Sequence, residues 1–146
     1  MKAVIAILIA LLLSSFAKPQ QKVVSEDTGV LGLLKSANMN STADQAIPIN
    51  TSNYIVRRII VTNASTSLTT AVGGFYAATG KTTAIVANTQ IYTALTGSTK
   101  YLDCTLGALL GTDRRTETTL YLSLTTPQGG AATADIYIIG DNLNGL

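Results

Sequence analysis

The chain has 146 residues, enough for one domain with a sizeable buried core. Only 12% of the residues are charged, about half the usual share, and ten Lys and Arg against eight Asp and Glu leave a net charge of +2. These charges are scattered along the chain, whereas nucleic-acid binding requires a concentrated basic surface. We therefore expect no direct nucleic-acid partner.

The residue types that most often hold metals or activate nucleophiles are scarce. The sequence contains no histidine and a single cysteine, Cys104. Zinc sites and catalytic thiols need several such partners, so we expect no metal, no cofactor and no enzymatic activity. Cys104 cannot form an intrachain disulfide and is predicted to be a buried apolar residue.

The first 17 residues combine Lys2, an apolar run over residues 3–13, and small residues that end at Ala17. This order is typical of a signal peptide that is cleaved after Ala17. If the segment is retained, its apolar side chains need a cover, and it becomes an assembly arm. The run is shorter than the roughly 20 residues of a membrane-spanning helix, so we expect no integral membrane span.

Residues 18–44 are predicted to form a linker or arm that packs locally. They are mostly polar, with one apolar patch over residues 30–34 that contains Val30, Leu31, Leu33 and Leu34. The sequence therefore divides into a signal-like or anchoring segment (1–17), an arm (18–44) and a folded domain (45–146).

From residue 45 onward, short runs rich in β-forming residues alternate with turn residues. The runs read QAIPIN, YIVRRIIVTNAS, GGFYAAT, TAIVANTQIYTAL, KYLDCTL, TTLYLSLTT and ADIYIIGDNL. This spacing predicts an all-β fold, an antiparallel, jelly-roll-like β-sandwich of roughly seven or eight strands with an extended N-terminal arm.

Two of these runs differ in how many faces they bury. In TLYLSLTT, the residues Leu120, Leu122 and Leu124 alternate with polar ones and predict one core face. The run YIVRRIIVT is apolar on both faces apart from Arg57 and Arg58. A monomeric sandwich would leave Ile55 and Ile59, or Val56 and Ile60, in water, so we expect this strand to contribute to a subunit interface, with both arginines at its rim.

The segments SLTTAVGG (67–74) and SLTTPQGG (123–130) share six of eight positions. Each follows a threonine-rich run and ends in glycines, which predicts two hairpin connections. The nearby GGFYAATGKTT resembles a phosphate-binding loop, but the glycine that the motif requires would fall at Phe75. A β-type run also follows instead of a helix, so we expect these segments to bind no nucleotide.

The sequence contains no convincing set of catalytic residues. No GxSxG motif is present, and nothing in the sequence brings two acids to a common cleft as glycoside hydrolysis requires. We interpret the candidate acids as turn or surface residues: Asp103, Asp113, Glu117, Asp135 and Asp141.

Three segments of the chain read LLKSANMNSTADQAIPI, YIVRRIIVTNASTSLTTAVGGFY and LYLSLTTPQGGAATADIYIIGD. Over about residues 33–143, the sequence resembles small uncharacterised structural proteins of tailed bacteriophages and prophages. The resemblance implies a virion component, such as a head decoration or fibre-type protein. It carries over no catalytic residue. The apolar N-terminus departs from that group, because virion parts assembled in the cytoplasm need no export.

Two functions follow as hypotheses. The first is a non-enzymatic virion structural protein that associates with other virion proteins or with copies of itself as a homo-oligomer. The second is an exported β-sandwich binding module of the periplasm, cell surface or medium. Under the first hypothesis the interface is predicted to contain Val30, Leu31, Leu33, Leu34, Ile55, Arg57, Arg58 and Ile59.

Overall fold

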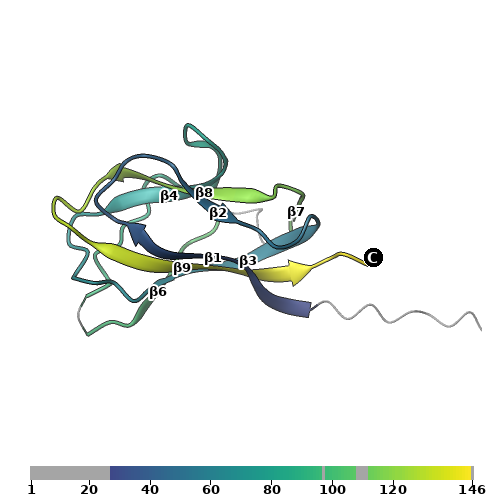
Figure 1. Cartoon of the computed structure of the whole chain (residues 1–146), viewed down its shortest axis with the longest axis horizontal. Helices are drawn as coiled ribbons and strands as arrows, with labels where there is room; N and C mark the ends of the chain where they lie inside the picture. Colours follow the sequence, from purple (N-terminus) through teal and green to yellow (C-terminus); the bar gives the residue numbers. More distant parts are fainter. Residues whose placement is uncertain (1–26, 97, 108–111, 146) are drawn as a thin grey trace, which may run out of the picture.

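The computed structural model describes residues 27–96, 98–107 and 112–145 as two packed layers of antiparallel strands (Figure 1). This confirms the predicted all-β sandwich. In the described part of the chain, no helix is long and apolar enough to cross a membrane. The strands are β1 (Asp27–Asn38), β2 (Gln45–Pro48), β3 (Tyr54–Thr62), β4 (Val72–Ala78), β5 (Thr82–Val86), β6 (Tyr101–Asp103), β7 (Arg114–Arg115), β8 (Thr119–Thr126) and β9 (Thr133–Asn142).

The strands divide between two sheets. Sheet A has the order β1-β9-β3-β6, with β7 also pairing with β3, and sheet B has the order β2-β8-β4-β5. Apart from the steps from β4 to β5 and from β6 to β7, consecutive strands lie in opposite sheets. Most connections therefore cross from one layer to the other. One face of sheet A packs against sheet B, and the opposite face lies on the outside of the sandwich.

The core lies between the sheets and is built by side-chain alternation. Leu120, Leu122 and Leu124 of β8 are all fully buried, as their spacing predicted. From sheet A, β9 contributes Ile136 and Ile138, which are also fully buried. Cys104 is buried at the margin of this core.

The sandwich begins earlier in the chain than predicted. Strand β1 pairs with β9 along its whole length, so Asp27–Asn38 belongs to sheet A and not to an arm. Its alternation is hidden in the sequence because the register shifts twice, between Val30 and Gly32 and between Leu34 and Ala37. Residues 1–26, which include the predicted segment 1–17, lie outside the described residues.

The two SLTT segments lie side by side and are not hairpin loops. Each belongs to a crossing between the sheets, from β3 to β4 and from β8 to β9. Gln128 of the second copy joins them: its side-chain oxygen accepts hydrogen bonds from the backbone N–H of Thr70 and Ala71, and its amide donates to the Ser67 carbonyl. The sequence similarity could not reveal this, because short glycine-ended turns serve hairpins and crossings equally well.

The GKTT stretch forms a strand-to-strand turn. Gly80 and Lys81 lie between β4 and β5, both with positive φ, at 71° and 60°. Lys81 Nζ donates a hydrogen bond to the Thr42 carbonyl at 3.3 Å. A strand follows here, as expected, where a phosphate-binding loop requires the start of a helix.

Candidate interface on the outer face of sheet A

A β-bulge in the middle of β3 decides which of its isoleucines face outward. Val56 pairs with Gly140 and Arg58 with Ile139, so Arg57 is an extra residue in the ladder. The extra residue reverses the alternation. Ile59 is fully buried in the core, while Ile60 is only partly buried and lies on the outer face. The prediction of Ile59 as an interface residue was therefore wrong, and Ile60 takes that place.

Outward-facing apolar side chains form a continuous patch across three neighbouring strands. The register places Val30 beside Ile139, and Leu33 beside Tyr137, which is in turn beside Ile60. Val30 is 49% exposed and the other four are partly buried. None of the five belongs to the core cluster. We call these five residues the outer apolar face.

Charged and polar groups border this face on two sides. Beside Ile60, the Arg58 guanidinium contacts the Asp103 carboxylate at 2.7 Å. At the end of the sheet, Asp141 accepts hydrogen bonds from the Thr28 hydroxyl and from Arg57. An apolar centre with a polar rim is the usual composition of a protein–protein contact.

Asp141 is the most buried carboxylate on this border, 3% exposed. The hydrogen bond from Thr28, together with the hydrogen bond and positive charge of Arg57, lowers the pKa of Asp141 against the opposing effect of burial. The ionised carboxylate therefore ties the start of β1 to β9 and β3, and it fixes the corner where the chain enters sheet A.

The remaining predicted interface residues separate into two groups. Val30, Leu33, Ile55, Arg57 and Arg58 are exposed or partly buried on the outer side of sheet A. Leu31 is 2% exposed in the core, and Leu34 packs partly buried against it. Leu31 was therefore assigned wrongly: it alternates with the outward Val30 and points inward, and the register shift between Val30 and Gly32 returns Leu33 to the outer side. Tyr137 and Ile139 were missing from the prediction, although they alternate in the sequence with Ile136 and Ile138, which face the core.

The free edge of β1 is already partly occupied. The backbone N–H of Asn50 donates to the Leu31 carbonyl at 2.9 Å, and its side chain donates to the Val30 carbonyl at 3.2 Å. Gly32 also forms a β-bridge with Ile49 across the two sheets. An additional strand could not pair along this edge without displacing these bonds, so the face offers more for binding than the edge.

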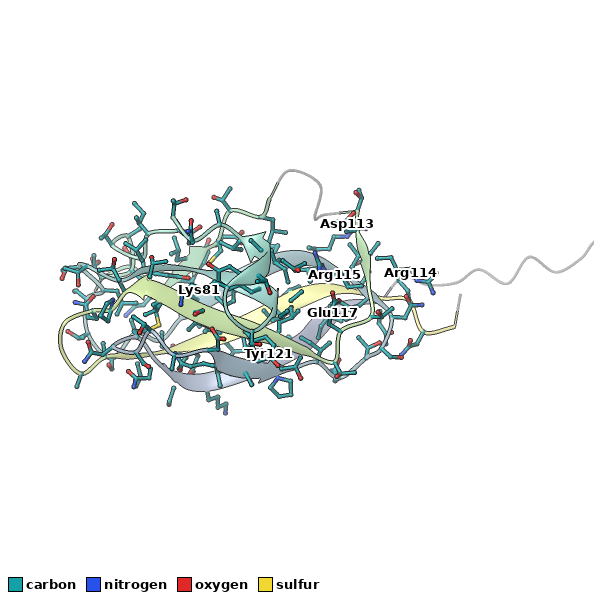
Figure 2. The ribbon with its side chains drawn as sticks, turned by 90° about the horizontal axis from the view of Figure 1, so that it is seen from above. Lys81, Asp113, Arg114, Arg115, Glu117 and Tyr121 are labelled. Carbon is teal, nitrogen blue, oxygen red and sulfur yellow. The ribbon has the colours of Figure 1, made fainter. Side chains whose placement is uncertain are left out.

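Four of the five candidate acids, Asp103, Glu117, Asp135 and Asp141, have structural partners. Asp135 accepts hydrogen bonds from the Asn63 side chain and the Ser36 backbone, and these lower its pKa. Glu117 forms an ion pair with the buried Arg115 at 3.3 Å. Figure 2 shows Asp113, Arg114, Arg115 and Glu117 gathered at one end of the molecule, away from Lys81. No group of three potential metal ligands occurs among residues 27–96, 98–107 and 112–145.

A hollow in the described part of the protein has a volume of about 440 Å³ and no ionisable side chain in its wall. Its wall consists of Val86, Ala87, Thr89, Gln90, Ile91, Thr105, Leu106 and Gly107. The Cys104 thiol is buried, and burial raises its pKa to about 12. Neither feature provides a reactive group.

Comparison of the chain with protein-family models, with curated proteins and with solved structures gives no match. The outer apolar face and its charged border are therefore the features from which a function can be inferred.

Proposed function

We propose that this protein is a non-enzymatic virion structural subunit, of the capsid decoration or fibre type, that associates with other virion proteins or with copies of itself. The observation that carries the proposal is the outer apolar face. It places five apolar side chains on the solvent side of a sandwich whose surface otherwise consists largely of threonine, serine and asparagine.

The strand order supports this proposal. We infer a jelly roll from the two four-strand orders, β1-β9-β3-β6 and β2-β8-β4-β5, and from the repeated crossings between sheets. Jelly rolls recur in viral capsid proteins, and also in lectins and cupins, so the architecture is compatible with a capsid role without being specific to it. The resemblance of the sequence to structural proteins of tailed bacteriophages and prophages favours the capsid role.

The outer apolar face can supply part of the free energy of a subunit contact. Full burial of a large apolar side chain contributes about 1.5–3 kcal/mol, so completing the burial adds about half of that at Val30, which is 49% exposed, and about a third or less at each of the four partly buried residues. The five residues on one subunit then supply on the order of 3 kcal/mol before the costs of association. Such a contribution supports assembly at the high local concentration of a virion surface.

The proposal is tested by sedimentation of the full chain over a wide concentration range. Wild-type protein should associate, and Ile60→Glu, which places a charge on the face beside Tyr137, should shift the protein to monomer. Ala84→Glu on the exposed edge strand β5 is the matched control and should sediment as wild type. Wild-type protein that stays monomeric and does not bind virions would contradict the proposal.

The second candidate function is an exported β-sandwich binding module, favoured by Lys2, the apolar run at 3–13 and the small residues before Lys18. Intact mass of the natural protein separates the two. A chain that starts at Lys18 supports export, and a chain that retains residues 1–17 supports the virion role.

A further inference from the structure

We propose that the outer apolar face is covered by residues 3–13 of a neighbouring copy of this chain. The inference rests on the proposed function and names the contact through which the subunits would associate. It assigns the five residues of the outer apolar face to an intersubunit groove for an uncharged, aliphatic segment.

The place where the chain enters sheet A is close to this face. Asp27 pairs with Asn142 and Thr28 with Asp141, so β1 begins at the end of the sheet where β9 finishes (Figure 1). Val30 is the first β1 residue of the outer apolar face and follows Thr28 by two positions. The apolar segment is therefore attached at the border of the surface that it could cover.

The connection has enough length to reach a neighbour. Residues 14–26 separate the apolar run from β1, and 13 residues span up to about 45 Å when extended. A sheet of four strands is only about 15 Å wide between its outer strands. A segment attached at one subunit can therefore lie across the sheet of an adjacent one.

The proposed assembly favours a neighbour over the same subunit. A segment that folded back would cover its own face and leave no apolar contact between copies, whereas a segment that crosses to a neighbour covers the face and links two subunits. Residues 14–26 are long enough for either path, and the mixing experiment below separates the two.

The chemistry of the segment matches the face. Residues 3–13 read AVIAILIALLL, with no polar side chain, and the face presents only aliphatic side chains and one tyrosine ring. The β1 edge is a poorer site because Asn50 already binds the carbonyls of Val30 and Leu31. Contact through side chains on the face leaves those hydrogen bonds intact.

The test uses a fluorescent reporter in the full chain. The protein contains no tryptophan, so Tyr137→Trp places a single indole at the centre of the face. A second variant adds Ile7→Asp and Leu11→Asp, which put charges in the apolar segment and change nothing in the described sandwich. Tyr101→Trp, which lies opposite Thr62 on the edge strand β6 and outside the five residues of the face, is the control position.

The expected result has two parts. Emission of Tyr137→Trp should lie at shorter wavelength than that of the variant with the charged segment, while the Tyr101→Trp reporter should show no such difference. Addition of excess wild-type protein, which has an intact segment but no tryptophan, should then move the emission of the charged-segment variant to shorter wavelength. This recovery occurs only if the segment comes from another copy.

Three outcomes would overturn the inference: equal emission from the two Tyr137→Trp variants, a difference that excess wild-type protein does not reverse, or a natural chain that begins at Lys18. Sedimentation of the same samples separates this inference from the proposed function. If the protein associates but the two Tyr137→Trp variants have the same emission, residues 3–13 do not cover the face, while the assembly role stands.

Discussion

Ile59 and Ile60 offer a matched test of the β3 bulge, because the two residues are identical, adjacent and in the same strand. Ile59 is fully buried between the sheets, whereas Ile60 lies partly buried on the outer side. Ile59→Ala removes buried methyl groups and leaves a cavity, which costs about 2–5 kcal/mol of unfolding free energy. Ile60→Ala loses a side chain that is only partly buried, together with some strand preference, which costs about 1–2 kcal/mol.

Urea unfolding of the full chain, followed by circular dichroism, measures both values. With a denaturant slope of about 1.5–3 kcal/mol/M, a loss of about 3 kcal/mol lowers the midpoint by roughly 1–2 M. Ile59→Ala should show this shift with an unchanged slope, and Ile60→Ala should instead weaken association in sedimentation. Equal stability losses, or a larger loss for Ile60→Ala at a concentration where the protein is monomeric, would refute the assignment of the bulge at Arg57.

Three further predictions concern packing, pH and the thiol. Gly140→Ala should destabilise the protein by several kcal/mol or prevent folding, because the added Cβ would clash with the Ile55 carbonyl oxygen. Gly29→Ala is the control: no atom lies within 4 Å of its added Cβ, so its thermal unfolding should stay near that of wild type. Asp141 has a pKa below its ordinary 3.8 in the folded protein, mainly through the Thr28 hydrogen bond; its ionised form therefore stabilises the fold above about pH 4 and this contribution is lost as the pH falls through the lowered pKa. Urea unfolding should show Asp141→Asn less stable than wild type at pH 7, with a smaller difference at pH 3, and a difference that grows on acidification would contradict the sign. Cys104, with its pKa raised by burial to about 12, should react with a thiol reagent at pH 8 only after denaturation; rapid labelling of native protein would show that the thiol is accessible.

Simple alternation was enough to predict parts of the fold. In β8 the leucines keep a strict period of two, and the predicted core residues Leu120, Leu122 and Leu124 are fully buried. Strand β1 was missed because two register shifts and Gly32 break that period within one short stretch. The β7 strand has only two residues, Arg114 and Arg115, which is too short for any pattern.

The sequence indicated an outward apolar face but not its full membership. The apolar character of both faces of β3 indicated that one of them would lie outside the core, and Ile55 does lie there, as do Val30 and Leu33 of β1. The sequence could not show that Ile60 replaces Ile59, since the bulge depends on pairing with β9. Nor could it show that Tyr137 lies between Leu33 and Ile60, because the order of strands in a sheet is set by contacts between distant parts of the chain.

The position of β9 has a consequence for biosynthesis. Among the described strands it is the last to leave the ribosome, yet it lies between β1 and β3, which are made earlier. Until it emerges, both early strands keep an unpaired edge, and pairings such as that of Thr28 with Asp141 must close a loop of more than 100 residues. The β1-β9-β3 part of sheet A can therefore form only after β9 has been made, and a chain that stops before Thr133 would expose two unpaired strand edges, so premature termination there should yield aggregated rather than partly folded protein.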